Sequence, residues 1–167
     1  MFYFKCLNFS AFIYVIYIIS FLILIYMKNN FTYIDYILLV LPLISGYTVS
    51  SICGPSKTSG QSVKFRPEPW VFGVVWPILY LLLGFAWTQS KQYSLFYIIL
   101  NILLNLWLIV YVCQKNKIGG IYIILLSLLS LVYIFISVKK QIKYYLAPLL
   151  IWLLFALLLN TFEVQNK

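Results

Sequence analysis

WVFGVVWPILYLLLGFAWTQ, residues 70–89, contains no charged side chain and consists almost entirely of apolar residues. A helix of about 20 apolar residues crosses the roughly 30 Å hydrocarbon core of a bilayer. Within lipid, a helix also pairs its backbone amides and carbonyls inside the same segment, which a single strand does not do. This stretch therefore predicts a transmembrane helix.

Apolar runs of similar length lie on both sides of this stretch, at 9–27, 33–53, 93–113, 119–138 and 144–162. The chain of 167 residues is 64% hydrophobic and 9% charged, whereas soluble domains are about half apolar and about one quarter charged. The connections are short, apart from a loop at 54–69 that contains Gly and Pro. The sequence predicts an all-α, polytopic transmembrane helical bundle, in an integral, multi-pass membrane protein.

The first apolar run, 9–27, has a second interpretation as a secretory signal peptide, because Lys5 precedes it. Signal peptides have an apolar core of about 7 to 15 residues followed by a small-residue cleavage site. This run is longer, and no such site follows Met27. A retained helix is the favoured interpretation.

The net charge of +9 raises the question of nucleic-acid binding. The Lys and Arg side chains do not gather in one arm or on one helix face, and they lie instead between the apolar runs. Basic residues at the ends of transmembrane helices contact lipid headgroups and set the topology. Membrane lipid is therefore the expected partner, and nucleic acid is not.

Few side chains are suited to catalysis or to metal binding. The chain has no histidine, which is the usual general base, metal ligand and axial haem ligand. Cys6, Cys53 and Cys113 show no CxxC spacing, so neither a disulfide framework nor a zinc site is indicated. The sequence therefore indicates no metal site. We expect that the protein requires no cofactor and is not an enzyme.

Asp35, Glu68 and Glu163 are the only acids, and all three lie near the ends of apolar runs or in the loop. We expect each to be a solvated charge. Glu68 stands out because Pro67 and Pro69 restrict the backbone on both sides of it. Ion-coupled carriers place ionisable groups at mid-membrane depth, so the sequence does not support coupled transport.

Asn101 and Asn105 lie one helical turn apart, on the same face of the run at 93–113. Side-chain amides in lipid form hydrogen bonds with neighbouring helices. Such a structural role is favoured, and contact with a ligand is the alternative. Gly46 and Ser50 are four residues apart, a spacing that allows another helix to approach closely, within the chain or between chains.

The most specific pattern is FRPEPWVFGVVWPILY, residues 65–80. It resembles the signature of the TspO/MBR family, in which a Pro-containing loop enters a helix through W-V-F-G-x-V-W-x-x-L-Y. A second match, at 148–160, reproduces the family spacing P-x-x-x-W-x-x-F-[AT]-x-x-x-N. It consists of Pro148, Trp152, Phe155, Ala156 and Asn160.

The resemblance implies a five-helix TspO/MBR-like domain at 33–167 with a 54–69 loop, and leaves 1–32 as an additional N-terminal transmembrane helix. It also implies a binding function for a flat hydrophobic ligand, a porphyrin or other tetrapyrrole, with a sterol as a further option. Photo-oxidative porphyrin degradation and passive transport of lipophilic molecules are the alternatives. A homodimer is the expected assembly.

The residues that the resemblance and the aromatic pattern assign to the ligand are Trp70, Phe72, Trp76, Tyr80, Asn105, Trp107, Trp152, Phe155 and Ala156. The chain departs from the family pattern in several places. Glu68 replaces a second proline and Phe65 stands where a Trp is common. Asn105 and Trp107 are two residues apart rather than three, which leaves the direction of Trp107 open. Thr161 replaces a Tyr associated with cholesterol, which weakens the sterol option.

Overall fold

The computed structural model describes residues 31–53, 63 and 66–165. The chain divides into two compact units, residues 1–37 and 38–167. The predicted first helix at 9–27 and most of the predicted loop lie outside the described residues. The described residues of the first unit, 31–37, include the beginning of one helix, and all other described residues belong to the second unit.

Five long helical segments make up most of the described chain, and each is long and apolar enough to cross a membrane. The prediction of an all-α transmembrane bundle is confirmed, and no strand occurs in the described part of the chain. The third segment is continuous from 91 to 113 but changes its helix type along its length. The elements are α2 (Tyr33–Cys53), α3 (Pro69–Gln89), the 3-10 helix η1 (Lys91–Tyr93), α4 (Ser94–Trp107), the π-helix η2 (Leu108–Cys113), α5 (Lys117–Ser137) and α6 (Lys140–Gln165).

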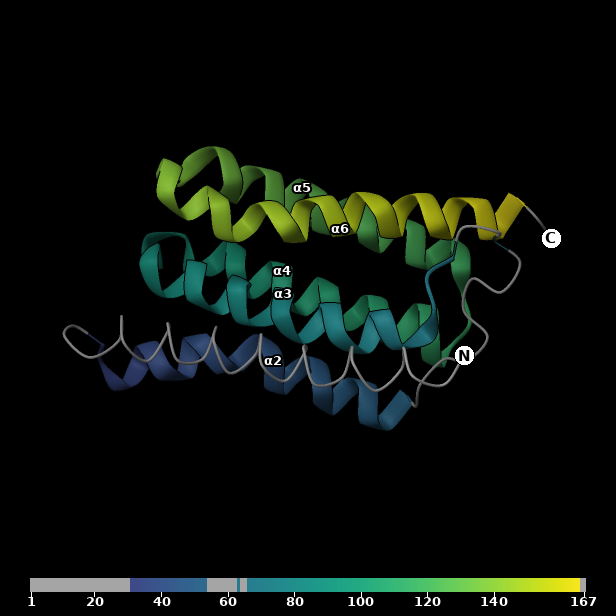
Figure 1. Cartoon of the computed structure of the whole chain (residues 1–167), viewed down its shortest axis with the longest axis horizontal. Coiled ribbons are helices and arrows are strands. Elements are labelled where there is room, and N and C mark those ends of the chain that lie inside the picture. Colours follow the sequence, from purple (N-terminus) through teal and green to yellow (C-terminus); the bar gives the residue numbers. More distant parts are fainter. Residues whose placement is uncertain (1–30, 54–62, 64–65, 166–167) are drawn as a thin grey trace, which may run out of the picture. The chain divides into compact units, whose positions relative to one another are not determined.

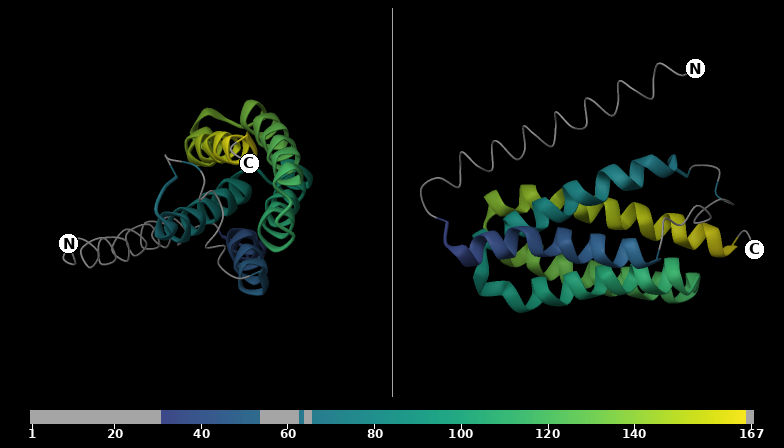
Figure 2. Two further views of the ribbon diagram at one scale, coloured as in Figure 1. Left: turned by 90° about the vertical axis from the view of Figure 1, so that its right-hand side faces the viewer. Right: turned by 90° about the horizontal axis from the view of Figure 1, so that it is seen from below.

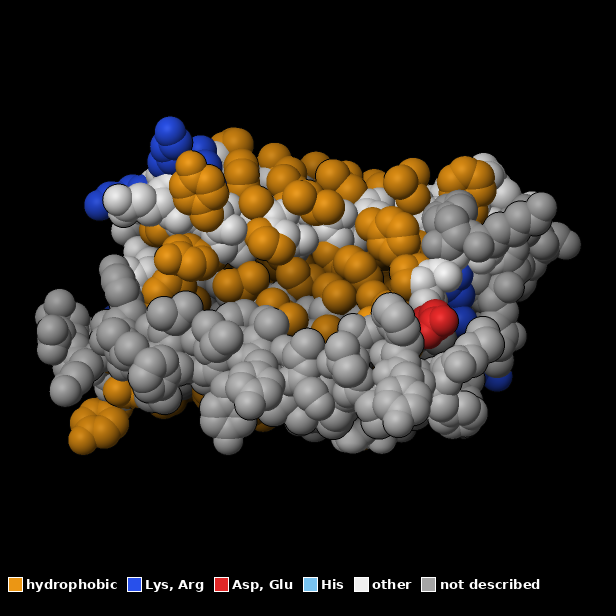
Figure 3. All heavy atoms as spheres, in the orientation of Figure 1, with side chains coloured by type: hydrophobic (Ala, Val, Ile, Leu, Met, Phe, Trp, Pro, Cys, Tyr) orange, Lys and Arg blue, Asp and Glu red, His pale blue; other side chains and the backbone are white. Residues whose placement is uncertain are grey.

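Short connections make consecutive helices antiparallel neighbours. In the second unit α4 packs against α5, α5 against α6, and α3 against α6 (Figures 1 and 2). Apolar side chains also cover the outer face, as a bilayer requires, and basic side chains gather near the α5–α6 connection (Figure 3). The interior between the helices is filled mainly by Leu83, Leu100, Leu104, Leu131, Ile134, Leu146, Leu149 and Leu153.

Local sequence explains where two of these helices begin. Pro69 is the first residue of α3, a position where the missing amide hydrogen costs nothing because no partner exists there. Asn116 caps α5, and its side chain accepts a hydrogen bond from the Gly119 amide at 2.9 Å. Both signals match the expected start of a helix after a loop.

Glycines allow α2 and α3 to approach each other closely. A Cβ atom added to Gly46 would lie 2.5 Å from the ring of Tyr80, and one added to Gly84 would overlap the backbone carbonyl of Leu39. Any larger residue at Gly84 therefore forces the two backbones apart. The close helix approach predicted at Gly46 is confirmed, and it occurs within the chain.

The segment predicted as a single helix at 93–113 changes from α to π geometry after Trp107. The wider turn is visible in the backbone bond from the Gln114 amide to the Ile109 carbonyl, at 3.0 Å. Such π segments frequently occur at functional sites. Apolar periodicity did not predict this one, because residues 106–113 have no polar face that would show a change in the number of residues per turn.

A disulfide joins the last residue of α2, Cys53, to the last residue of η2, Cys113, with Cα atoms 5.0 Å apart. The interpretation that the cysteines indicate no disulfide was wrong for this pair. Pairing depends on whether two Cα atoms come within about 7 Å in space. Two helix ends that meet satisfy this condition at any separation along the chain.

Asp35 also differs from its prediction as a solvated charge. In the first unit it is 4% exposed, and its Oδ2 accepts hydrogen bonds from the Thr32 amide at 2.9 Å and the Thr32 hydroxyl at 2.7 Å. A carboxylate that accepts backbone and hydroxyl donors at a helix start is stabilised without water. The carboxylate therefore has a local role in starting α2.

Candidate functional site

Aromatic side chains from three segments of the second unit contact one another in the half of the bundle where α3 begins and α6 ends. Each ring lies within 6.5 Å of at least one other, measured between centroids. Together they form the aromatic cluster, which consists of Phe72, Trp76, Tyr80, Trp107, Tyr111, Trp152 and Phe155.

The α3 members of the cluster lie four residues apart, so Phe72, Trp76 and Tyr80 share one helix face. Trp76 and Tyr80 stack with centroids 5.5 Å apart. Trp76 is also central to the contacts between helices, because its ring lies 5.6 Å from that of Trp107 and 6.5 Å from that of Trp152. It therefore connects α3 to α4 and to α6.

Trp107 lies at the junction of α4 and η2, and Tyr111 follows four residues later in η2. Their rings stack with centroids 5.2 Å apart and an interplanar angle of 14°. The direction of Trp107, which the sequence left open, is thus toward the cluster. Tyr111 was missed by the sequence analysis, although its spacing of four residues after Trp107 is a signal that could have found it.

On α6, Trp152 lies 5.5 Å from Phe155 and 5.7 Å from Phe72 of α3. Ala156 is buried one turn after Trp152. The spacing of these three α6 residues places them on one helix face, and this face is turned into the bundle. Trp152 contacts Phe72 and Trp76 of α3 in edge-to-face geometry, a favoured arrangement for aromatic rings.

Three polar atoms of the cluster are buried and have no hydrogen-bond partner among the described residues. They are the indole nitrogens of Trp107 and Trp152 and the hydroxyl of Tyr80. A buried donor without a partner costs about 1 to 3 kcal/mol. A ligand with acceptor atoms that reaches these donors would recover that free energy.

Two of the predicted ligand residues, Trp70 and Asn105, make no ring contact with the cluster in the described part of the chain. Trp70 is 47% exposed, and its indole nitrogen donates to the Glu68 carboxylate at 2.6 Å. In the described part of the chain no ring contact joins Trp70 to the cluster. Glu68 is itself exposed, as predicted.

Asn105 bonds across the bundle. Its Nδ2 donates to the Ser45 hydroxyl at 3.1 Å and to the Asn101 carbonyl at 2.8 Å, and Ser45 in turn lies 3.2 Å from Asn101 Oδ1. The predicted structural role of the two amides is confirmed, because they attach α4 to α2. Asn105 Oδ1 is nevertheless buried without a partner among the described residues, so contact with a ligand stays open as well.

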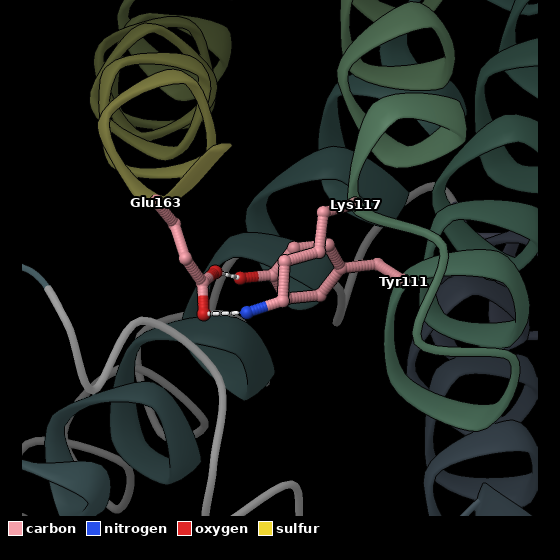
Figure 4. A network of polar contacts seen from close by, with 3 residues as sticks. All are labelled: Tyr111, Lys117 and Glu163. Atoms are coloured by element: carbon pink, nitrogen blue, oxygen red, sulfur yellow. Dashed lines mark hydrogen bonds and ion pairs between the residues drawn. The ribbon is translucent and has the colours of Figure 1, made fainter. Parts of the chain in front are cut away.

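Glu163, predicted as a solvated charge, is instead 1% exposed. Its carboxylate accepts a hydrogen bond from the Tyr111 hydroxyl and forms an ion pair with Lys117 (Figure 4). The position near the end of α6 suggested water, but the start of α5 and the π-helix meet it there. This ionic triad of Tyr111, Lys117 and Glu163 borders the aromatic cluster through Tyr111.

Comparison with known proteins agrees with this geometry. The model of the TspO/MBR family matches residues 34–164. The chain is 34% identical over 110 residues to a tryptophan-rich protein TspO from Archaeoglobus fulgidus, an alignment that covers 58% of this chain and 69% of that protein.

The chain belongs to the TspO/MBR family. The matched region covers the five described transmembrane segments except for Tyr33 and Gln165 at their two outer ends, and it contains every member of the aromatic cluster. In this TspO/MBR protein the two motif segments, on α3 and α6, meet directly through the contact of Phe72 with Trp152. Family membership establishes the fold and the membrane location, and it leaves the ligand to be argued from the site itself.

Proposed function

We propose that this TspO/MBR protein binds a flat hydrophobic molecule, of the porphyrin type, at the aromatic cluster. The observation that carries the proposal is the combination of seven contacting rings with three buried donors that lack partners. Aromatic rings provide stacking surfaces for a flat ligand, and a few placed polar groups fix its orientation. Phe72, Trp76, Tyr80, Trp107, Trp152 and Phe155 are the proposed contacts, with Tyr111 added.

The ring contacts between helices offer surfaces that a flat ligand can replace. Trp76 contacts Trp107 and Trp152 through their rings, and aromatic pairs contribute about 0.5 to 1.5 kcal/mol each. A flat aromatic ligand that separates these tryptophans replaces each contact between two tryptophan rings with a contact between a tryptophan ring and the ligand. Ring nitrogens or carboxylate oxygens of the ligand then accept hydrogen bonds from Trp107, Trp152 or Tyr80.

The test is a titration of the full-length protein in a neutral detergent with protoporphyrin, followed by the absorbance of the porphyrin. We expect saturable binding, and roughly fivefold weaker affinity in Trp107→Phe and Trp152→Phe, because each loses a donor worth about 1 kcal/mol. Trp152→Ala, which also removes the ring face, is expected to weaken binding further.

Trp87→Phe is the matched control, because Trp87 is a buried tryptophan of α3 whose indole nitrogen already donates to Ser94 at 2.9 Å. Its porphyrin affinity is expected to equal that of the wild type. Unchanged affinity in both cluster variants, in protein that remains folded by circular dichroism, would exclude the aromatic cluster as the binding site.

A further inference from the structure

Arg66 is a cation beside the aromatic cluster that the function proposed above does not use. Its guanidinium carbon lies 5.9 Å from the centroid of the Phe72 ring, and Phe72 contacts Trp152 at 5.7 Å. The side chain is only partly exposed. Phe72 and Trp152 therefore connect Arg66 to Trp76, the ring at the centre of the cluster.

The charge of Arg66 is not neutralised within the described part of the chain. No ion pair to it occurs there, and its Nε atom is buried without a hydrogen-bond partner. The neighbouring carboxylate of Glu68 accepts instead from Trp70. Leaving a buried guanidinium donor unpaired is costly, so the position is suited to an anion that arrives from outside the chain.

Another cation near the cluster, among the described residues, behaves differently. Lys117 is paired with Glu163, so its charge is already balanced. Arg66 forms no ion pair in the described part of the chain, and its Nε atom still has a hydrogen bond to donate. A guanidinium also presents two parallel N–H groups that match the geometry of a carboxylate.

We infer that Arg66 recognises a carboxylate on the ligand, so that the site selects flat aromatic acids over neutral rings of the same shape. The inference rests on the proposed function, because it requires the ring of the ligand to lie on the aromatic cluster. A ring on Phe72 and Trp152 directs a short acidic side chain toward the guanidinium that lies over Phe72. A neutral sterol offers neither the aromatic face nor the charge.

The test compares protoporphyrin, a dicarboxylic acid, with its dimethyl ester, which has the same ring and no charge, in a neutral detergent. The wild type is expected to bind the acid roughly tenfold more tightly, which is about 1.4 kcal/mol, since only the acid accepts a charge-assisted hydrogen bond from the guanidinium. Arg66→Gln is expected to lose this preference while binding the ester as the wild type does. Arg66→Lys, which keeps the charge and loses the planar fork, is expected to retain part of it.

Lys115→Gln is the matched control, because Lys115 is an exposed cation in the η2–α5 connection, and its removal lowers the net charge equally. It is expected to keep the full preference for the acid. Equal wild-type affinity for acid and ester, or a preference that persists in Arg66→Gln, would overturn the inference. The unchanged ester affinity of Arg66→Gln shows that the variant is folded.

The failure of the proposed function has a separate signature in the same experiment. If Trp152→Ala weakens binding of the ester while Arg66→Gln changes neither ligand, the cluster is the site and only the role of Arg66 is wrong. If neither ligand binds the wild type in a saturable way, the proposed function fails, and the inference about Arg66 fails with it.

Discussion

Helix α3 has a tryptophan in each of two aromatic groups, and the polar atoms of the two groups differ. In the half near the α3–α4 connection, Trp87 stacks on Tyr97 with centroids 5.6 Å apart. The indole nitrogen of Trp87 donates to Ser94, and the Tyr97 hydroxyl pairs with Ser90 at 2.8 Å. In the half near the start of α3, the aromatic cluster holds three buried donors without partners in the described chain.

The difference separates rings that stabilise the fold from rings that are suited to a ligand. Buried polar groups in folded proteins are almost always paired, and the Trp87–Tyr97 group follows that rule. The aromatic cluster departs from it at three atoms within one group of contacting rings. Such departures are expected at functional sites. The two halves also differ in the contacts that join their helices. The disulfide and the ionic triad both belong to the half with the cluster.

The largest expected effect comes from the disulfide, which closes a loop of about 60 residues. Replacing Cys53 and Cys113 by Ser is expected to lower the free energy of unfolding by up to about 4 kcal/mol. The helices persist in the unfolded chain in detergent, so the measured loss should lie below that limit. Thermal unfolding with and without a reductant measures it.

Cys6→Ser is the control for the loss of a thiol, and it should leave the unfolding temperature unchanged. The reductant should affect the wild type and not the double Ser variant. An unfolding temperature that is the same for oxidised and reduced wild type would show that the bond between α2 and η2 does not stabilise the bundle.

The second effect concerns the ionic triad. Lys117→Met is expected to destabilise the protein by about 2 kcal/mol, because the buried Glu163 carboxylate loses its ion pair with Lys117. Breaking a fully buried pair costs about 3 to 5 kcal/mol, and the 23% exposure of Lys117 reduces that value. Denaturant unfolding in detergent provides the measurement.

The double variant Lys117→Met with Glu163→Gln removes both charges together and is expected to regain part of the loss. Lys140→Met, at an exposed lysine at the start of α6, should have little effect. If the double variant is no more stable than Lys117→Met alone, the charge of the buried Glu163 carboxylate is not the cause of the destabilisation.

The sequence predicted the helices of this protein better than the polar contacts between them. Apolar length alone predicts each transmembrane segment, since lipid admits few other structures, and α2 has the predicted bounds of 33–53. The resemblance assigned Phe72, Trp76 and Tyr80 to the ligand, and their four-residue spacing places them on one helix face. The burial of Glu163 could not be predicted in this way, because it depends on a lysine and a tyrosine that lie 46 and 52 residues before it in the chain.

The smallest effect separates the two aromatic groups directly. Trp87→Phe is expected to destabilise the protein by about 1 kcal/mol, because it removes a satisfied hydrogen bond to Ser94. Trp107→Phe removes an indole nitrogen that has no partner in the described chain, so its loss of packing is offset by the release of an unsatisfied donor. The free energy of unfolding should therefore fall in the first variant and change by less than about 0.5 kcal/mol in the second. Equal destabilisation of the two, measured without ligand in the same detergent, would mean that the unpaired indole nitrogen of Trp107 carries no cost. The two aromatic groups would then differ in how their rings pack, and not in the cost of unpaired donors.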